Sequence, residues 1–253
     1  MIKKLFLTAT FILITTAAFA QHSDMALVKS GKYLPLYGDI DAYVEVSDFY
    51  IDTIAVTKAK YLEFLRENPQ WRKSNVKGIF ADDSYLSSWP EDLDYGDGHP
   101  DEPVTNISWF AAKEYCKYQG KRLPTLDEWE YAAMADEKTR DAREKVSYNQ
   151  YILSWYERPK RGNEIVGSTF KNVWGIYDLH GLIWEWTQDF NSVMIASESR
   201  SGGNDTNLFC SAAAVGATDL MNYAAFMRYA YRSSIKGNNT GNNLGFRCAK
   251  DGN

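Results

Sequence analysis

Along the first part of the chain, the apolar residues change from alternating to helical spacing. Residues 40–56 alternate and are rich in β-branched and aromatic side chains, a pattern that predicts strands. Residues 58–68 then place apolar side chains on one helical face, and Thr57 before them is a suitable N-cap. The sequence therefore predicts strands followed by a helix that begins directly after Thr57.

Capping residues mark two more helices. Ser108 precedes a helical pattern over residues 109–119, and Gly120 ends that pattern. Thr125 and Glu128 form the Thr-x-x-Glu capping box, in which each side chain bonds the other residue's backbone N–H. We therefore expect a third helix to begin after Thr125.

Loop-forming residues dominate much of the remaining sequence. Residues 81–103 carry Asp, Gly and Pro at high density, which predicts a long irregular loop. The charged run 135–147 is interpreted as an exposed helix end or loop. From residue 162 onward, short strand-like runs lie between Gly and Asn clusters, and 236–243 predicts a surface loop. Helices near the front and a turn-rich remainder indicate the α+β class.

Composition limits the class of protein. The 253 residues are 24% charged and 45% hydrophobic, which is typical of a globular chain and excludes a collagen-like, coiled-coil or wholly disordered one. With 28 basic against 33 acidic residues the net charge is −5, and no basic stripe occurs, so nucleic acid is not an expected partner. No linker-like stretch or internal repeat occurs, which predicts one domain over residues 21–253.

The N-terminal residues have the pattern of a signal peptide. Lys3 and Lys4 precede an uncharged, mostly apolar run at 5–17, and residues 18–20 form an Ala-x-Ala cleavage site. A transmembrane anchor is the alternative, but the run is shorter than the ~20 residues that a span needs. We expect residues 1–20 to be cleaved on export. The protein would then be periplasmic or secreted, with no membrane span after cleavage.

Three segments together resemble one known family. They are residues 108–133 with R-L-P-T-x-x-E-W-E, 172–189 with G-x-x-W-E-W, and 231–250 with G-F-R-C. In this order and spacing they resemble the formylglycine-generating enzyme family, also called the sulfatase-modifying-factor domain. The resemblance covers nearly the whole chain after the signal peptide. It implies a fold related to C-type lectins, with low regular secondary structure.

The first of these motifs also has a local structural interpretation. Pro124 stiffens the turn that leads into the capped helix. Trp129 and Tyr131 are expected to bury their rings against the sheet. Arg122 is expected to clamp a carboxylate or backbone carbonyls. We therefore interpret these residues as structural rather than catalytic.

The second motif contains a candidate calcium site. Asp178 and Glu185 offer hard oxygen ligands, and Gly181 and Ile183 between them can offer backbone carbonyls on a tight turn. Calcium sites combine carboxylates and carbonyls in this way, at ~2.3–2.6 Å. The resemblance implies a structural calcium at these four positions. The alternative is a plain turn in which Glu185 forms an ion pair.

Two of the three cysteines have an implied structural role. The resemblance implies a disulfide between Cys116 and Cys248, which would close a loop of ~130 residues and add several kcal/mol in the chain-entropy model. An oxidising compartment outside the cytoplasm would allow such a bond to persist. The alternative is two buried free thiols.

The residues that the resembled enzymes use for chemistry are missing. Formylglycine formation in that family depends on two cysteines, and paired thiolates are soft ligands suited to copper(I). Counting back from Cys248 without a gap, those positions hold Asp219 and Ala224. The stretch 216–234 contains no cysteine, and Ala224 cannot ligate a metal or form a thiolate. We therefore do not expect formylglycine formation.

The segment 207–234 resembles a subgroup of the family more closely. It is similar to the accessory proteins that accompany copper nitrite reductases in denitrifying bacteria. The resemblance places several residues in or near the former active-site cleft: Cys210, Asp219, Met221, Tyr223, Met227 and Arg228. Structural alternatives are a buried apolar thiol at Cys210 and a buried ion pair between Asp219 and Arg228.

These observations favour an exported accessory factor that is not an enzyme. It would bind a partner, such as copper nitrite reductase, or bind copper while an exported metalloenzyme matures. One alternative is an enzyme with altered oxidoreductase chemistry that uses Cys210, Asp219, Tyr223 or Arg228. Another is a lectin-like or peptide-binding module that uses the eight Trp residues and the loop at 81–103.

Overall fold

A three-stranded antiparallel sheet lies at the centre of the fold. The computed structural model describes residues 24–36, 42–157, 164–191 and 220–252. The sheet has the order β1-β4-β7, with the bounds Met25–Val28, Phe49–Asp52 and Ala249–Asp251. Ile51 of β4 pairs with Ala26 on one side and Ala249 on the other. The sheet therefore joins the two ends of the described chain.

Two smaller sheets extend this arrangement. Strand β2 (Gly31–Tyr33) pairs antiparallel with β3 (Val44–Val46), so the strands expected within 40–56 are confirmed by β3 and β4. Strand β5 (Trp184–Glu185) pairs parallel with β6 (Leu244–Gly245). The β5–β6 pair places the W-E-W segment beside the G-F-R-C segment.

Three helices begin at the predicted caps. Helix α1 spans Lys58–Glu67, α2 spans Trp109–Tyr118, and α3 spans Leu126–Ala133. The side-chain oxygens of Thr57 and Ser108 accept backbone N–H groups of the first turns of α1 and α2. In the capping box of α3, Thr125 and Glu128 exchange hydrogen bonds of 3.1 Å and 2.8 Å. A short 3₁₀ helix, η1 (Pro69–Trp71), follows α1.

Two further helices were not predicted. Helix α4 spans Val146–Glu157, after a mostly exposed loop that covers most of the charged run 135–147. Helix α7 spans Leu220–Ser234, so the prediction of strand-like runs there was wrong. Leu, Met, Ala and Arg are good helix formers, and α7 is rich in them and free of Gly and Pro. No helix of the described residues is long and apolar enough to cross a membrane.

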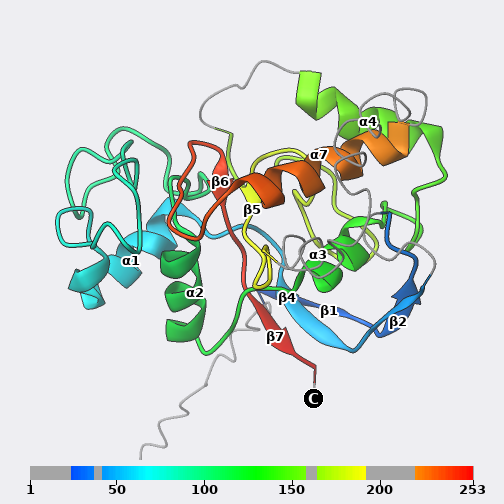
Figure 1. The fold of residues 1–253 in the computed structure, drawn as a ribbon, viewed down its shortest axis with the longest axis horizontal. Helices are drawn as coiled ribbons and strands as arrows, with labels where there is room; N and C mark the ends of the chain where they lie inside the picture. The colour runs from blue at the N-terminus through cyan, green and yellow to red at the C-terminus, as the bar shows by residue number, and fades with distance from the viewer. Residues whose placement is uncertain (1–23, 37–41, 158–163, 192–219, 253) are drawn as a thin grey trace, which may run out of the picture.

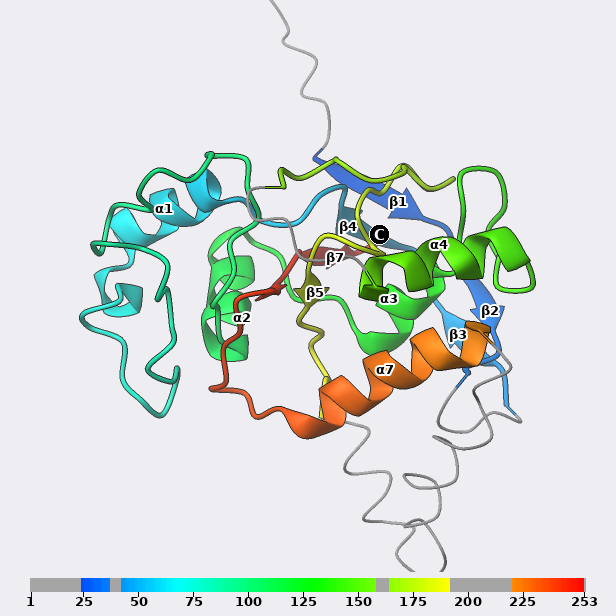
Figure 2. The same cartoon turned by 90° about the horizontal axis from the view of Figure 1, so that it is seen from above.

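The helices cover the sheet in two groups. Figures 1 and 2 show α1 and α2 at one end of the molecule and α3, α4 and α7 toward the other, with β4 and β7 near the middle. The α1–α2 end encloses an aromatic cluster that includes Tyr61, Phe64 and Trp89. Trp129 and Tyr131 of α3 pack with the sheet residues Phe49 and Ile51, which confirms their expected burial.

Irregular segments make up much of the remaining fold. Residues 81–103 form turns rather than helices or strands, as predicted, yet Tyr85, Leu86 and Trp89 within them are buried in the aromatic cluster. Residues 236–243 form the predicted surface loop. The residues of the expected signal peptide lie outside the described part of the chain.

A disulfide joins the two halves of the chain. Cys116 in α2 is bonded to Cys248, which directly precedes β7, with a Cα–Cα distance of 5.5 Å. Both residues are fully buried. The pairing implied by the family resemblance is therefore present, and the alternative of two free thiols is not.

Candidate functional site

A buried ion pair connects the three motif segments. Arg247 of the G-F-R-C segment and Glu185 of β5 form two short contacts, Nε–Oε2 at 2.8 Å and Nη2–Oε1 at 2.7 Å. Their side chains are 0% and 1% exposed. Trp129 of α3 donates its indole N–H to the same carboxylate at 2.8 Å. One carboxylate therefore binds residues from both other motifs.

The rest of the Arg247 guanidinium is also hydrogen-bonded. It donates to the backbone carbonyls of Asp52 and Tyr177, at 3.1 Å and 2.9 Å. A buried ion pair offsets its desolvation only when such remaining donors are satisfied. The Glu185–Arg247 pair meets this condition, and it fixes β5 relative to α3 and β4.

A second arginine holds the start of α3. Arg122 donates to both carboxylate oxygens of Glu128, at 2.7 Å and 2.6 Å, and also binds Asp251 of β7. The hydrogen bonds to Glu128 raise the pKa of Arg122 further above its ordinary value. The expectation that Arg122 clamps a carboxylate is confirmed, and its role is structural.

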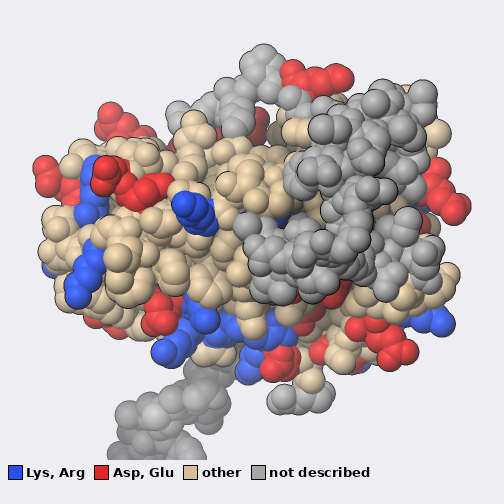
Figure 3. Space-filling view, in the orientation of Figure 1, with Lys and Arg blue, Asp and Glu red and all other residues tan. Residues whose placement is uncertain are grey.

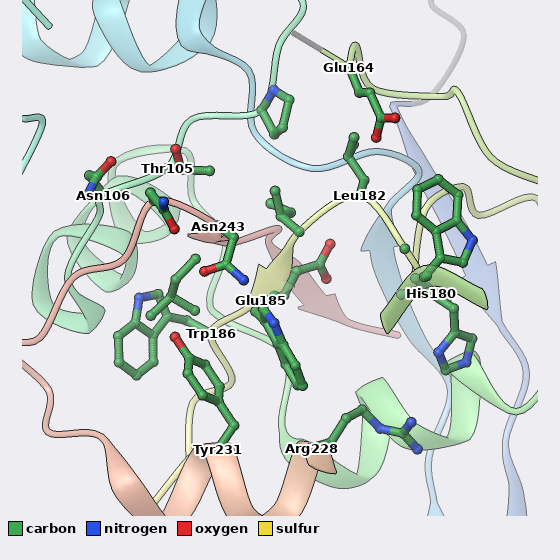
Figure 4. A pocket seen from close by; sticks show the side chains of 18 of the residues that line it. Thr105, Asn106, Glu164, His180, Leu182, Glu185, Trp186, Arg228, Tyr231 and Asn243 are labelled. Atoms are coloured by element: carbon green, nitrogen blue, oxygen red, sulfur yellow. The ribbon is translucent and has the colours of Figure 1, made fainter. Parts of the chain in front are cut away.

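A cavity of about 980 Å³ lies between α7, the 179–190 segment, and loops at 103–106 and 242–244. In Figure 4, Tyr231 and Arg228 extend from α7 on one side, and Thr105, Asn106 and Glu164 lie on the opposite side. The aromatic side chains of the lining are Trp129, Trp155, Trp184, Trp186, Phe190 and Tyr231. No cysteine is among the described lining residues.

One glutamate anchors α7 to α3 beside this cavity. Glu130 binds the Arg228 guanidinium through both carboxylate oxygens, at 2.9 Å and 2.8 Å, and binds Arg232 at 2.8 Å. Both guanidinium groups also lie over the Trp129 ring, 5.7 Å and 5.5 Å from its centroid. Burial alone would raise the pKa of Glu130, but the two arginines hold it well below its usual range.

His180 lies in the cavity wall as a neutral imidazole. Its Nε2 is 2.7 Å from the carbonyl oxygen of Ala133, so this nitrogen carries the proton and donates. Burial, and then the charge of Arg228, lower the pKa of His180 to about 4. The ring of Tyr148 packs edge-on against His180, and the hydroxyl lies 2.9 Å from Nε2.

The predicted calcium positions have protein partners in this structure. Asp178 adopts a left-handed backbone, and its carboxylate accepts the backbone N–H groups of Gly167 and Thr169. Glu185 has both oxygens bound by Arg247 and Trp129, which supports the alternative of an ion pair. No group of three or more His, Cys, Asp or Glu in the described chain is placed to hold a metal. A calcium at Asp178, Gly181, Ile183 and Glu185 stays a prediction.

The structure describes the predicted cleft residues only in part. Cys210 and Asp219 lie outside the described residues, and the side chains of Met221, Tyr223 and Ala224 on α7 are not described. Arg228 lines the cavity, and its ion-pair partner Glu130 was not predicted. Arg228 and Arg232, one helical turn apart, were a signal for a shared acidic partner on a neighbouring element.

Charges on the visible face are mixed. In Figure 3, acidic and basic side chains are interspersed along the lower edge, and the region near the centre is largely uncharged. No single sign dominates this face. Long-range attraction of a strongly charged partner to it would therefore be weak.

Comparisons with known proteins agree with this architecture. Residues 10–252 match the family described as the sulfatase-modifying factor enzyme 1-like domain. The chain is 28% identical over 246 residues to the inactive C-alpha-formylglycine-generating enzyme 2 of Bos taurus, covering 81% of this chain and 78% of that protein. It is 34% identical over 174 residues to the formylglycine-generating enzyme of Streptomyces coelicolor, covering 61% and 54%.

A solved structure has a similar fold. The structure of PvdO from Pseudomonas aeruginosa superposes with a TM-score of 0.50 at 17% sequence identity. The superposition covers 90% of this chain and 94% of that one. This similarity supports the fold, with its mixture of helices, strands and long irregular segments.

Removing either member of the buried ion pair should destabilise the fold strongly. Glu185→Gln or Arg247→Met leaves one buried charge uncompensated, so we expect each to cost about 3–5 kcal/mol. The double variant should cost much less than the sum of the two. The free energies of unfolding of the wild type, the two single variants and the double variant in guanidinium chloride give this coupling energy, provided that the m-value is the same for all four.

A surface ion pair gives the matched control. Lys29 and Asp48 form a 2.8 Å contact with side chains 57% and 32% exposed. Lys29→Met with Asp48→Asn should change the free energy of unfolding by less than about 1 kcal/mol. If the double variant lost as much free energy of unfolding as the two single variants together, the two side chains would act independently and the prediction would be wrong.

Proposed function

This chain belongs to the sulfatase-modifying factor enzyme 1-like domain family, and from that premise we propose that it is an exported accessory protein that does not make formylglycine. The observation that carries the proposal is the absence of the cysteine pair, because Asp219 and Ala224 occupy those positions. Ala224 lies on α7, the helix that forms one wall of the cavity. Its methyl side chain can neither bind copper(I) nor form a thiolate.

The remaining cysteines do not supply a substitute pair. Cys116 and Cys248 are bonded to each other, which leaves Cys210 as the single other cysteine of the sequence. Two thiolates are therefore not available in one native molecule. A bovine relative of the family bears the name inactive, which supports a role for members without the conversion activity.

Binding of an exported metalloenzyme is the proposed role. The resemblance of residues 207–234 to the proteins that accompany copper nitrite reductase supports this partner. Export rests on the signal-peptide pattern at residues 1–20. Copper could be held transiently at Cys210 with the thioethers of Met221 and Met227, which are soft ligands. Calcium at Asp178 and Glu185 would have a structural role only.

A conversion assay tests the missing chemistry. The purified protein is incubated with copper(I), oxygen and a peptide that carries the sulfatase motif Cys-x-Pro-x-Arg. We expect mass spectrometry to find the cysteine unchanged, because no thiolate pair is present to bind the metal. The formylglycine-generating enzyme of Streptomyces coelicolor serves as the positive control. Conversion of the peptide by this chain would overturn the proposal.

A capture experiment tests the partner. Immobilised protein is exposed to copper-free and copper-loaded nitrite reductase, and the retained protein is measured. We expect retention of the copper-free form, since an accessory factor acts before maturation is complete. Elemental analysis of the wild type and of the Cys210→Ser variant then shows whether copper binding depends on the Cys210 thiol. Retention of neither form of the reductase would contradict the proposed partner.

A further inference from the structure

Several polar side chains line the cavity beside α7 and are accessible from it. The Asn106 amide, the Glu164 carboxylate, the Tyr231 hydroxyl and Nδ1 of His180 make no hydrogen bond to the described protein, and none of them is a buried atom that lacks a partner. We propose that this cavity binds a carbohydrate, an oligosaccharide of a few sugar rings. The inference goes beyond the accessory role, which names no small ligand.

Asn106 is the strongest single indication. It is 5% exposed and has a left-handed backbone with φ of 57°. Its backbone is satisfied, because the N–H donates to Gly241 at 2.8 Å and the carbonyl accepts from Leu86 at 3.0 Å. Its side-chain amide makes no hydrogen bond to the described protein and is not among the buried polar atoms without a partner, so it is accessible from the cavity that it lines. Left-handed backbone at non-glycine residues is common at ligand sites.

The polar groups that line the cavity include both donors and acceptors. Arg232 uses Nη1 for Glu130, and its other guanidinium nitrogens have no partner among the described residues. Nδ1 of His180 accepts, because Nε2 carries the proton, and Glu164 also accepts. Asn106 and Tyr231 can do both. A carboxylate or phosphate would satisfy only donors and an amine only acceptors, whereas each sugar hydroxyl donates and accepts.

Aromatic rings make up part of the cavity lining. Trp184 and Tyr231 are partly exposed, and their ring centroids lie 4.7 Å apart at an interplanar angle of 35°. The negative face of such rings attracts the C–H groups that a sugar ring presents on its apolar side. This combination of aromatic rings and mixed hydrogen-bonding groups suits the recognition of carbohydrates.

A glycine places a further ring in the lining. Gly181 has φ of 125°, and a Cβ there would lie 2.7 Å from Cε2 of Trp155. Only glycine therefore lets Trp155 lie against this turn. The cavity volume of about 980 Å³ is near the upper end of the range for small-molecule sites, so it holds more than a single sugar ring.

Titration with three neutral trisaccharides tests the proposal. Cellotriose, maltotriose and triacetylchitotriose are added to the purified protein, and binding is followed by calorimetry and by tryptophan fluorescence. We expect at least one to bind with a Kd below about 1 mM and to change the fluorescence, because Trp155 and Trp184 line the cavity. No binding of any of the three at about 10 mM would overturn the proposal.

Matched variants locate the binding. Tyr231→Phe removes one cavity hydroxyl and keeps the ring, and Asn106→Gly removes the amide while tolerating the left-handed backbone. Each should weaken binding about three- to tenfold, the value of one lost hydrogen bond. Tyr50→Phe on the partly exposed strand β4 should leave Kd within about twofold. Equal effects of Tyr231→Phe and Tyr50→Phe would place the sugar elsewhere and overturn the proposal.

The test separates this inference from the accessory role. Triglycine serves as a probe without hydroxyl groups, and its binding in place of the trisaccharides would assign the cavity to peptides and overturn the inference. Capture of nitrite reductase without any sugar binding would leave the accessory role standing and the carbohydrate site refuted. Sugar binding without capture of nitrite reductase would support the carbohydrate site and contradict the proposed partner.

Discussion

The buried pair of Glu185 and Arg247 is the interaction on which the rest of the fold depends. Its two side chains come from segments 62 residues apart in sequence, and Trp129 adds a third segment to the same carboxylate. Such a pair tolerates burial only because each donor and acceptor around it is satisfied. Backbone hydrogen bonds between loops, such as that from Val56 to Phe246, join distant segments as well, and the side-chain contacts and the disulfide add to them in fixing the relative positions of the elements.

One turn of α3 supplies the anchors of both cavity walls. Glu128 closes the capping box and binds Arg122, Trp129 binds Glu185 beneath β5, and Glu130 binds two arginines of α7. The E-W-E motif therefore connects several segments of the fold, because each of its three side chains binds a different one. The cavity is the space between the β5 segment and α7, both of which are attached to this turn.

Sequence alone predicted the local features and missed the long-range ones. The caps at Thr57, Ser108 and Thr125 follow from rules that involve only neighbouring residues, and the disulfide followed from the family resemblance. Helix α7 was not predicted because Gly and Asn clusters lie on both sides of its helix-forming residues, and such clusters indicate loops and short strands. The two arginines of α7 indicate an acidic partner, but the sequence does not show that Glu130, 98 positions from Arg228, supplies it. No local pattern indicates the contact between Arg247 and Glu185 either. In the structure, Arg247 binds the carboxylate of Glu185, which was predicted as a calcium ligand.

Helix α3 holds the wall of the cavity formed by α7, and hydrogen exchange of the Glu130→Gln variant tests this role of Glu130. This change removes the carboxylate charge shared by Arg228 and Arg232, and Glu157→Gln at the exposed end of α4 is the control. We expect amides of α7 to exchange about tenfold faster or more in the Glu130→Gln variant, while those of β1, β4 and β7 keep their protection. Unchanged protection of α7 would contradict this role.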